Sequence, residues 1–300
     1  MKVCFIGACG HSQQAYKYLA TRQDVAFVGF APGSHHEEKM PGFAKNMPHF
    51  ADFKVMLDEV QPDLAVVSPV FGLTAGVILE CAKRKIHVFS EKPVATTLED
   101  LERVEKAVRE SGIRFCAMHY LRYDPAFYLG ANLVRSGAIG EVKLVTAQKS
   151  YKYGTRPDWY QDADLYGGTI PWVGIHAIDW IYHFTGKGFL SVTTQKVGEM
   201  AAVCQFTMED GVIGAMNLDF YRPAGAATHG DDRVRCAGTQ GVLEVRDGKV
   251  ILITPEKTEI MEPEQAPELL EEFLAGGGIP AEEIFYLTRV ALIARDGGTL

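Results

Sequence analysis

Residues 2–19 read KVCFIGACGHSQQAYKYL, in which a short apolar run, a glycine-rich turn and a helical pattern follow one another directly. The apolar run Lys2–Ile6 predicts a buried strand, and residues 13–21 have the spacing of a helix. A turn at that place lets the backbone approach a pyrophosphate, whose negative charge the helix N-terminus favours. The turn consists of Gly7, Ala8, Cys9, Gly10, His11 and Ser12.

This turn departs from the G-x-G-x-x-G pattern at two positions. Cys9 stands where the second glycine is expected, and Ser12 stands where the third is expected. A tight structural turn that binds nothing is therefore an alternative. The strand–turn–helix context favours dinucleotide binding, so we assign all six residues of the turn to a cofactor site.

The alternation of strand and helix patterns continues to about residue 120. Apolar runs expected to be strands cover residues 25–31, 64–67, 86–89 and 114–118, and helical patterns cover 52–60, 74–83 and 97–111. Continuous apolar strands between helices indicate a parallel sheet that is covered on both faces. We therefore expect an α/β fold whose residues 1–120 form a doubly wound Rossmann domain.

Residues 121–300 have a different character. After a helix over residues 125–135, expected strands cover 142–153, 190–196, 202–208, 212–220, 233–237, 242–245 and 250–254, and helices over 264–274 and 280–294 close the chain. Several strands alternate apolar and polar residues, which indicates an open, mostly antiparallel sheet in an α+β domain. We expect this domain to bind a small-molecule substrate and, through its uncovered sheet face, to form a homodimer or homotetramer.

The composition indicates which kinds of partner the protein can bind and in which cellular compartment it is expected to lie. The formal net charge is -8 and no basic run is present, which argues against nucleic acid. The six cysteines form no C-x-x-C pair, so we expect free thiols in the cytoplasm and no zinc site. The most apolar stretch, residues 64–79, is too short and interrupted to span a membrane, and no signal peptide precedes the first strand.

The second predicted strand ends without the carboxylate that usually holds the ribose hydroxyls. It runs into Ser34, His35 and His36, and the first acidic residue is Glu37. This leaves room for a 2′-phosphate, so we assign Ser34 and His35 to cofactor binding and leave the choice between NAD and NADP open. An exposed loop is the alternative for the two histidines.

Ser90-Glu91-Lys92-Pro93 follows the fourth predicted strand. Ligands bind at the carboxyl ends of strands in such sheets, and a lysine there can be desolvated and placed to move a proton or polarise a carbonyl. A surface turn is the alternative. We assign Glu91, Lys92 and Pro93 to the cofactor site and Lys92 also to catalysis. Ser68 and Pro69, after the third strand, complete the predicted cofactor residues.

Six stretches, distributed over nearly the whole chain, resemble the glucose–fructose oxidoreductase and inositol dehydrogenase family (Gfo/Idh/MocA). They are HVFSEKPVA at 87–95, RYDPAF at 122–127, GAIGEV at 137–142, GG at 167–168, GIHAID at 174–179 and GTQG at 238–241. The resemblance implies a Rossmann domain followed by an open mixed sheet. It also implies that Lys92 is a catalytic or cofactor-orienting residue and that His176 is a substrate-binding or acid–base residue.

One position departs from the family pattern. An aspartate is usual two residues before Gly174, and this chain has Trp172 there. Positions four apart share a helical face, so Trp172 and His176 are both expected to face a substrate cleft. An indole cannot act as a general base. Either His176 performs the proton transfer, or the substrate differs, or activity is lost; Trp172 itself is an apolar wall for a substrate or a packing residue.

Three more residues are candidates for substrate contact. Tyr120 and Arg122 follow the fifth predicted strand, and Trp159 lies in a loop expected to cover the site. Asp179, three residues after His176, either orients that histidine or pairs elsewhere. Aromatic side chains with a few polar groups suit polyol recognition, and they also occur in cores and lids.

Three functions fit these features. The first is an NAD(P)-dependent oxidoreductase that transfers a hydride between nicotinamide and a sugar, a polyol or a related carbonyl compound. The second is a non-catalytic dinucleotide-binding sensor or accessory protein, in which Trp172 marks lost chemistry. The third is an NAD-dependent lyase or glycosidase that oxidises its substrate transiently, as some members of the family do.

Overall fold

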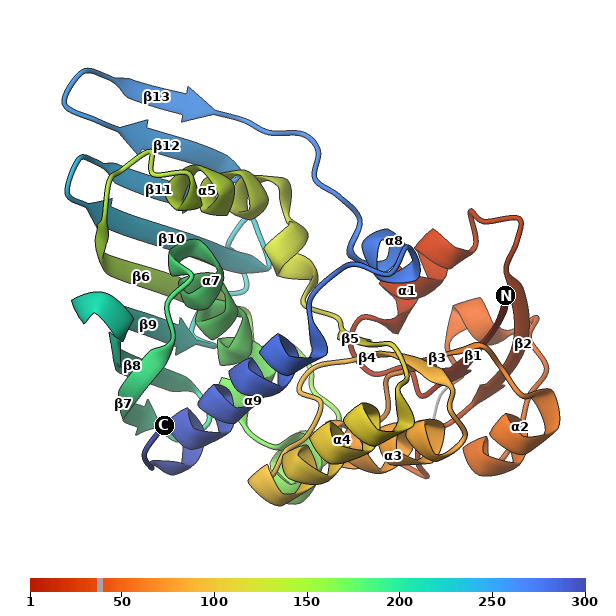
Figure 1. The fold of residues 1–300 in the computed structure, drawn as a ribbon. Helices are drawn as coiled ribbons and strands as arrows, with labels where there is room; N and C mark the ends of the chain where they lie inside the picture. The colour runs from red at the N-terminus through yellow and green to blue at the C-terminus, as the bar shows by residue number, and fades with distance from the viewer. Residues whose placement is uncertain (37–39) are drawn as a thin grey trace. The chain divides into compact units, whose positions relative to one another are not determined.

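The computed structural model describes residues 1–36 and 40–300, which divide into two units (Figure 1). The first unit contains residues 1–118, 157–167 and 269–288, and the second contains residues 119–156, 168–268 and 289–300. The first change of unit lies within two residues of the expected boundary at 120. Two later segments, 157–167 and 269–288, also belong to the first unit. A single boundary at residue 120 therefore does not describe how the chain divides.

The first unit contains a five-stranded parallel sheet in the order β2-β1-β3-β4-β5. Its strands are β1 (Lys2–Ile6), β2 (Ala26–Ala31), β3 (Leu64–Val67), β4 (His87–Ser90) and β5 (Phe115–Ala117). The order reverses at β1, because β2 lies on one side of it and β3 on the other. Ligands bind in such sheets outside the carboxyl ends of the strands at that reversal. The expected Rossmann-type sheet is confirmed.

Helices of the first unit begin and end at local signals. They are α1 (Ser12–Leu19), α2 (Phe53–Val60), α3 (Thr74–Lys83), α4 (Leu98–Ser111), α6 (Ala163–Tyr166), α8 (Leu269–Leu274) and the first half of α9 (Ala281–Asp296). The Thr97 hydroxyl accepts a hydrogen bond from the Asp100 amide, and Gly112 has a φ of +67° after α4. These two residues cap the helix, Thr97 through its side chain at the N-terminus and Gly112 through its left-handed backbone at the C-terminus.

The helix predicted over residues 264–274 is shorter in the structure. Helix α8 begins only at Leu269. Pro267 lacks an amide hydrogen and disfavours a helical conformation for the residue before it, so the segment from 264 to 268 stays irregular.

The second unit contains an eight-stranded mixed sheet in the order β13-β12-β11-β10-β6-β9-β8-β7. Its strands are β6 (Val142–Tyr151), β7 (Phe189–Val197), β8 (Ala201–Met208), β9 (Ile213–Asp219), β10 (Gly230–Gly238), β11 (Val242–Arg246), β12 (Lys249–Ile253) and β13 (Thr258–Met261). Strands β6 and β9 are parallel, whereas the other neighbours are antiparallel. The expected mostly antiparallel sheet is confirmed, and the short edge strand β13 was not predicted.

Helices α5 (Pro125–Arg135) and α7 (Ile175–Thr185) cover one face of this sheet (Figure 1). Burial alternates along the strands: on β8, Ala202, Cys204 and Phe206 are buried and the residues between them are exposed. Asp210 and Asp247 have φ of 55° and 53° in the turns that connect β8 to β9 and β11 to β12, which are antiparallel neighbours. The sheet therefore has an inner face packed on helices and an outer face of exposed side chains.

Candidate functional site

The glycine-rich turn of the first unit connects β1 to α1 at the carboxyl edge of the sheet. Gly7 and Gly10 have φ of +74° and +76°, a conformation that glycine adopts without strain. A Cβ on Gly7 would lie 2.5 Å from the Ser68 carbonyl oxygen, and the Cys9 amide donates to that oxygen at 2.7 Å. The turn is thus fixed against the end of β3, where Ser68 and Pro69 were predicted to contribute.

A buried carboxylate lies directly behind the turn. Glu91 is fully buried and accepts hydrogen bonds from the His11 amide at 2.6 Å and from the Lys92 amide at 3.0 Å. The His11 imidazole Nδ1 lies 3.0 Å from both carboxylate oxygens, and a Cβ on Gly10 would lie 2.2 Å from one of them. The two motifs, 80 residues apart in sequence, are therefore joined in one structure.

The electrostatics of this group suit an anionic ligand on its outer side. Burial alone would raise the pKa of Glu91, but the charges of His11 and Lys92 and the hydrogen bonds from His11 outweigh it and lower the pKa. The Lys92 ammonium lies 3.9 Å from the same carboxylate and is 2% exposed. The carboxylate faces inward, whereas the His11 ring is 31% exposed beside the N-terminus of α1. These residues fit a dinucleotide pyrophosphate.

The loop after β2 holds the other predicted cofactor residues. The His36 amide donates to the Ser34 hydroxyl at 3.2 Å, and the rings of His35 and His36 are 4.0 Å apart. The strand itself ends at Ala31 without a carboxylate. Glu37, the first acidic residue that follows, lies outside the described residues.

Trp159 belongs to the first unit, in the segment 157–167. Its ring packs edge-on against Phe71 at 5.0 Å and beside Tyr160 at 4.2 Å, and its side chain is only 9% exposed. A Cβ on Gly72 would lie 1.9 Å from the Asp164 carbonyl oxygen, so the segment packs closely on the residues that follow β3. The structure thus places Trp159 in an aromatic cluster.

Trp172 and His176 lie in the second unit, where the backbone is not a regular α-helix. A π-helical turn covers Ile170–Gly174, and α7 begins at Ile175. The regular α-helix assumed over residues 172–176 is therefore replaced at its start by a π-turn, in which hydrogen bonds join residues five apart. Both side chains are buried, with exposed fractions of 8% and 4%.

Arg122 and Asp179 form a buried ion pair in the same unit. The Arg122 Nε donates to Asp179 Oδ1 at 3.0 Å, and its Nη2 donates to the same oxygen. Burial would raise the pKa of Asp179, but Arg122 and His119 hold it well below its usual value. Asp179 therefore pairs with Arg122. His119 Nδ1 lies 3.6 Å from the other carboxylate oxygen, and its ring centroid lies 6.1 Å from that of His176.

Sequence reasoning missed a further buried charge in the second unit, Lys149 on β6. Its ammonium donates to the Tyr151 hydroxyl at 2.6 Å and to Asp232 Oδ2 at 2.9 Å, and it lies 4.8 Å from the Trp180 ring centroid. Burial lowers the pKa of Lys149 to about 8, against the opposing charge of Asp232. Alternation was the available signal, because it places residue 149 on the same face as the buried Val145 and Ala147.

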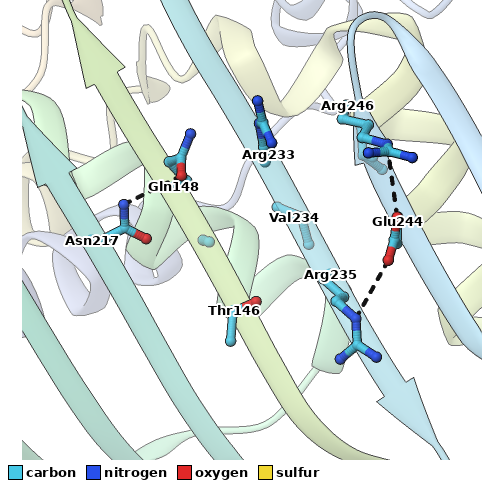
Figure 2. Close-up of a pocket in the computed structure, with 10 residues that line it drawn as sticks. Thr146, Gln148, Asn217, Arg233, Val234, Arg235, Glu244 and Arg246 are labelled. Carbon is cyan, nitrogen blue, oxygen red and sulfur yellow. Dashed lines mark hydrogen bonds and ion pairs between the residues drawn. The ribbon is translucent and has the colours of Figure 1, made fainter. Parts of the chain in front are cut away.

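The outer face of the second sheet carries a shallow pocket lined by polar side chains of four strands (Figure 2). Glu244 pairs with Arg235 at 3.4 Å and with Arg246 at 3.8 Å, and the Asn217 amide donates to Gln148 at 3.4 Å.

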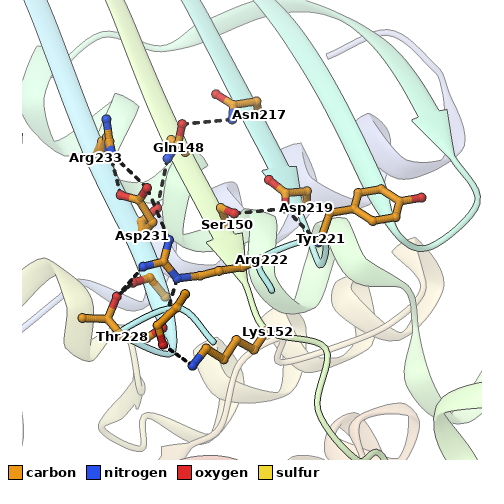
Figure 3. A network of polar contacts seen from close by, with 12 residues as sticks. Gln148, Ser150, Lys152, Asn217, Asp219, Tyr221, Arg222, Thr228, Asp231 and Arg233 are labelled. Atoms are coloured by element: carbon orange, nitrogen blue, oxygen red, sulfur yellow. Dashed lines mark hydrogen bonds and ion pairs between the residues drawn. The ribbon is translucent and has the colours of Figure 1, made fainter. Parts of the chain in front are cut away.

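Farther along the same strands, Ser150 donates to Asp219 at 3.0 Å, and Arg233 donates to both oxygens of Asp231 (Figure 3). Arg222 also lies 3.5 Å from the Asp231 carboxylate. The outer face is thus a row of ordered ion pairs.

Within residues 1–36 and 40–300, no group of three or more histidine, cysteine, aspartate or glutamate side chains is arranged to hold a metal ion. In the same part of the chain, no helix combines the length and apolar character needed to cross a membrane. All six cysteines are free thiols, five of them buried.

Two family models match this chain, one in each half. The model described as an oxidoreductase family with an NAD-binding Rossmann fold matches residues 1–119, and the GFO/IDH/MocA C-terminal domain matches residues 131–244. A solved structure from Thermotoga maritima, whose name describes an oxidoreductase, is 38% identical with a TM-score of 0.93. That match covers 98% of this chain and 97% of the other.

More distant relatives match in part of the sequence or in fold alone. The scyllo-inositol 2-dehydrogenase (NADP+) of Bacillus subtilis is 30% identical over 46% of this chain and 40% of its own length. An oxidoreductase from Agrobacterium radiobacter, solved with NAD+, L-tartaric acid and magnesium, has a TM-score of 0.84 at 15% identity and covers 100% of this chain and 98% of its own.

The chain matches between 34% and 57% of the length of the curated relatives that align first. The matched family models, the near-complete Thermotoga maritima match and the parallel sheet of the first unit agree with one another. The chain therefore belongs to the Gfo/Idh/MocA family of oxidoreductases, whose N-terminal domain is an NAD-binding Rossmann fold.

Proposed function

We propose that this protein is an NAD(P)-dependent dehydrogenase or reductase that acts on a hydroxyl or carbonyl group of a sugar, a polyol or a related compound. The observation that carries this proposal is the joining of the glycine turn to Lys92 through Glu91. A dinucleotide turn and a buried cationic side chain then lie at the carboxyl edge of one sheet, where such folds bind their ligands.

The first unit would hold the cofactor and supply a positive charge. Nicotinamide, when bound, accepts or donates the hydride. The N-terminus of α1 and the His11 ring would face the pyrophosphate. Lys92 would orient or polarise the reacting oxygen, because a desolvated ammonium interacts more strongly with a partial negative charge than one in water.

The second unit would supply the proton-transfer group. His176 is buried, and an imidazole changes charge near neutral pH, as the base for a secondary alcohol must. Trp172 carries no proton that it can exchange there, so it would serve as an apolar surface. Because Lys92 and His176 belong to different units, kinetics of the two single variants and the double variant tests whether they serve one reaction.

Titration of the purified protein with NADH and with NADPH tests the cofactor half of this proposal. Gly10→Ala should abolish binding, because a Cβ there meets the Glu91 carboxylate and φ is +76°. Gly112→Ala is the matched control, since its φ is +67° but a Cβ would enter open space. Absence of binding of either dinucleotide to the unmodified protein would contradict the proposal. The missing carboxylate after β2 favours tolerance of NADPH.

We also propose that the outer face of the second sheet is where two copies of the chain associate. This face combines the ordered ion pairs of Figures 2 and 3 with exposed apolar residues. Leu144 and Ile213 are register partners on β6 and β9 and are 36% and 56% exposed, and Val203 on β8 is 48% exposed. A face with apolar residues among paired charges suits a self-complementary contact.

A further inference from the structure

The π-turn over Ile170–Gly174 begins without a capping side chain of its own. The first amides of a helix have no acceptor within it, so the residue before the helix usually supplies one. Thr169 occupies that place here, but its side chain makes no capping hydrogen bond to the turn. Pro171 has no amide hydrogen, and the Trp172 amide donates to the Gly168 carbonyl oxygen at 3.2 Å. The Thr169 amide therefore needs an acceptor from another part of the chain.

Glu199 supplies that acceptor from the turn between β7 and β8, 30 residues away in sequence. Its Oε2 accepts a hydrogen bond from the Thr169 amide at 2.6 Å, and its carbonyl oxygen accepts one from the Thr169 hydroxyl at 2.7 Å. The helix dipole also favours a carboxylate at the N-terminus of a helix. Glu199 thus does for the π-turn what a capping residue does for an ordinary helix.

The segment that Glu199 holds is closely packed. Gly168 has a φ of +96°, and a Cβ there would lie 3.0 Å from Arg295 Cδ and 3.3 Å from Glu199 Oε2. The Lys196 ammonium of β7 donates to the Arg295 carbonyl oxygen at 3.2 Å. The hairpin of β7 and β8 is therefore fixed both to the start of the π-turn and to the end of α9, within the second unit.

The other end of the π-turn is fixed against β9. A Cβ on Gly174 would lie 2.7 Å from Leu218 Cδ2, so the backbone of Gly174 packs directly on that side chain. Trp172 lies between these two fixed points. π-Helical turns are rare and occur frequently at functional sites. The position of the Trp172 ring therefore depends on the contact at Glu199 as well as on β9.

We propose that Glu199 is a positioning residue, which holds the start of the π-turn and thereby keeps the Trp172 ring in place for the substrate. This inference rests on the proposed function, in which Trp172 is an apolar surface for a sugar or polyol. Glu199 acts through the Thr169 backbone. A hydrogen bond to a charged group changes an equilibrium by about tenfold or more. Without it, the turn is correctly held for a smaller fraction of the time, and the apparent affinity for the substrate falls by that fraction.

Matched substitutions separate positioning from general stability. Glu199→Ala removes the acceptor, whereas Glu199→Gln keeps an oxygen that can accept from the Thr169 amide. Glu209 supplies the control, because its carboxylate accepts a hydrogen bond from the Gly188 amide at 2.8 Å at the opposite end of β8. Both glutamates are exposed and each binds one backbone amide, so Glu199→Ala and Glu209→Ala should lower stability by similar amounts. Only Glu199→Ala loosens the π-turn.

The test is steady-state kinetics of these three variants with the best substrate of a polyol screen, together with hydrogen exchange of the Thr169 amide. Glu199→Ala should raise the KM of the hydroxyl substrate by about tenfold and speed the exchange by at least as much. The KM of the dinucleotide should change less than about twofold, because the predicted cofactor residues lie in the first unit. Glu199→Gln and Glu209→Ala should stay within about threefold of the parent in both measurements.

An unchanged KM in Glu199→Ala would overturn the inference, whether or not exchange at Thr169 becomes faster. An equal rise in KM for Glu209→Ala would overturn it as well. If Glu199→Ala does not fold, Gly168→Ala takes its place, since its Cβ crowds the Glu199 carboxylate. Its control is Gly137→Ala, where φ is +88° and a Cβ enters open space, and only Gly168→Ala should raise the KM.

Failure of the proposed function can be told apart from failure of this inference. A protein that turns over no hydroxyl compound would reject that function, and the NMR signal of the Trp172 indole N–H would then decide the inference. A shift of this signal in Glu199→Ala, but not in Glu209→Ala, would support the positioning of Trp172 by Glu199. Identical signals in the two variants would overturn it.

Discussion

Glu91 is the residue at which the two motifs of the first unit meet. Its carboxylate holds the amide of His11 at the head of α1 and the amide of Lys92 after β4. Removing one partner of a buried, hydrogen-bonded charge group leaves the others uncompensated. Glu91 therefore stabilises the fold and arranges the predicted cofactor site at the same time.

Glu91→Gln should lower the free energy of unfolding by about 3 kcal/mol at neutral pH, as measured by urea denaturation. The folded-state pKa of Glu91 lies below 4.5, so its contribution is present above that pH and is lost as pH falls through the folded value. The difference between variant and parent should shrink in that acidic range. Glu59→Gln, at an exposed position of α2, is the control and should change stability by less than about 0.5 kcal/mol.

Lys92 and His176 should each matter for turnover. Removal of a general acid–base group lowers rates by roughly 100- to 10,000-fold, so His176→Ala should reduce kcat by that order. Lys92→Ala removes a charge that stabilises the reacting oxygen and should reduce kcat by roughly 100- to 1,000-fold. Trp172→Phe keeps a ring and should mainly raise KM. Steady-state kinetics with the best substrate of a polyol screen measures all three. A kcat for His176→Ala within about threefold of the parent would assign the proton transfer to another group.

At the scale of single elements, β6 carries a lysine in an unusual place. Lys149 lies on the inner face of the sheet, fully buried against Trp180, whereas Lys143 on the same strand is exposed. Asp232 and Tyr151 offset part of the cost of burying the ammonium. Its pKa of about 8 in the folded chain lies below the ordinary value of 10.5.

This shift predicts how stability depends on pH. Between pH 8 and 10 the unfolded chain keeps the Lys149 proton and the folded chain loses it, so stability should rise with pH in that window. Relative to Lys149→Met, the parent should gain roughly 2 kcal/mol from pH 8 to pH 10 in urea unfolding. Lys143→Met should run parallel to the parent. Parallel curves for Lys149→Met and the parent would show that Lys149 titrates normally.

Local patterns predicted most of the elements, because their causes are local. The run Lys2–Ile6 is apolar throughout, and Thr97 and Gly112 bound their helix by hydrogen bonding and backbone conformation. The π-turn over Ile170–Gly174 was not predicted, because a shift of one residue in helical hydrogen bonding depends on tertiary packing. The helix predicted over residues 264–274 began too early, because Pro267 disfavours a helical conformation at the residue before it.

The sequence identified the motifs of the candidate site one by one, but it did not predict which of them are in contact. The glycine turn and the segment 90–93 were both singled out, yet their connection through Glu91 joins residues 80 apart, which no local pattern encodes. Trp159 was expected in a loop that covers the site, and its edge-on contact with Phe71 in the first unit joins residues that no local pattern relates. Lys149 was overlooked because a charged residue on a strand is ordinarily assumed to face solvent.

At the scale of the whole molecule, we expect two copies of the chain to associate through the outer face of the second sheet. Ile213→Asp places a charge on an apolar residue that is 56% exposed and should convert a dimer or tetramer into smaller species in light scattering at micromolar concentration. Val55→Asp, at a 47% exposed position on α2 of the first unit, should leave the assembly intact. A monomeric parent protein would refute the proposed association.

Net hydride transfer is the central claim, and one measurement tests it most directly. The purified protein is mixed with NAD+ or NADP+ and each member of a panel of polyols and sugars, and nicotinamide absorbance is followed. We expect at least one compound to give lasting formation of NADH or NADPH that His176→Ala slows by 100-fold or more, as loss of an acid–base group does. Consumption of a panel compound without any net change in absorbance would contradict the account and indicate transient oxidation instead.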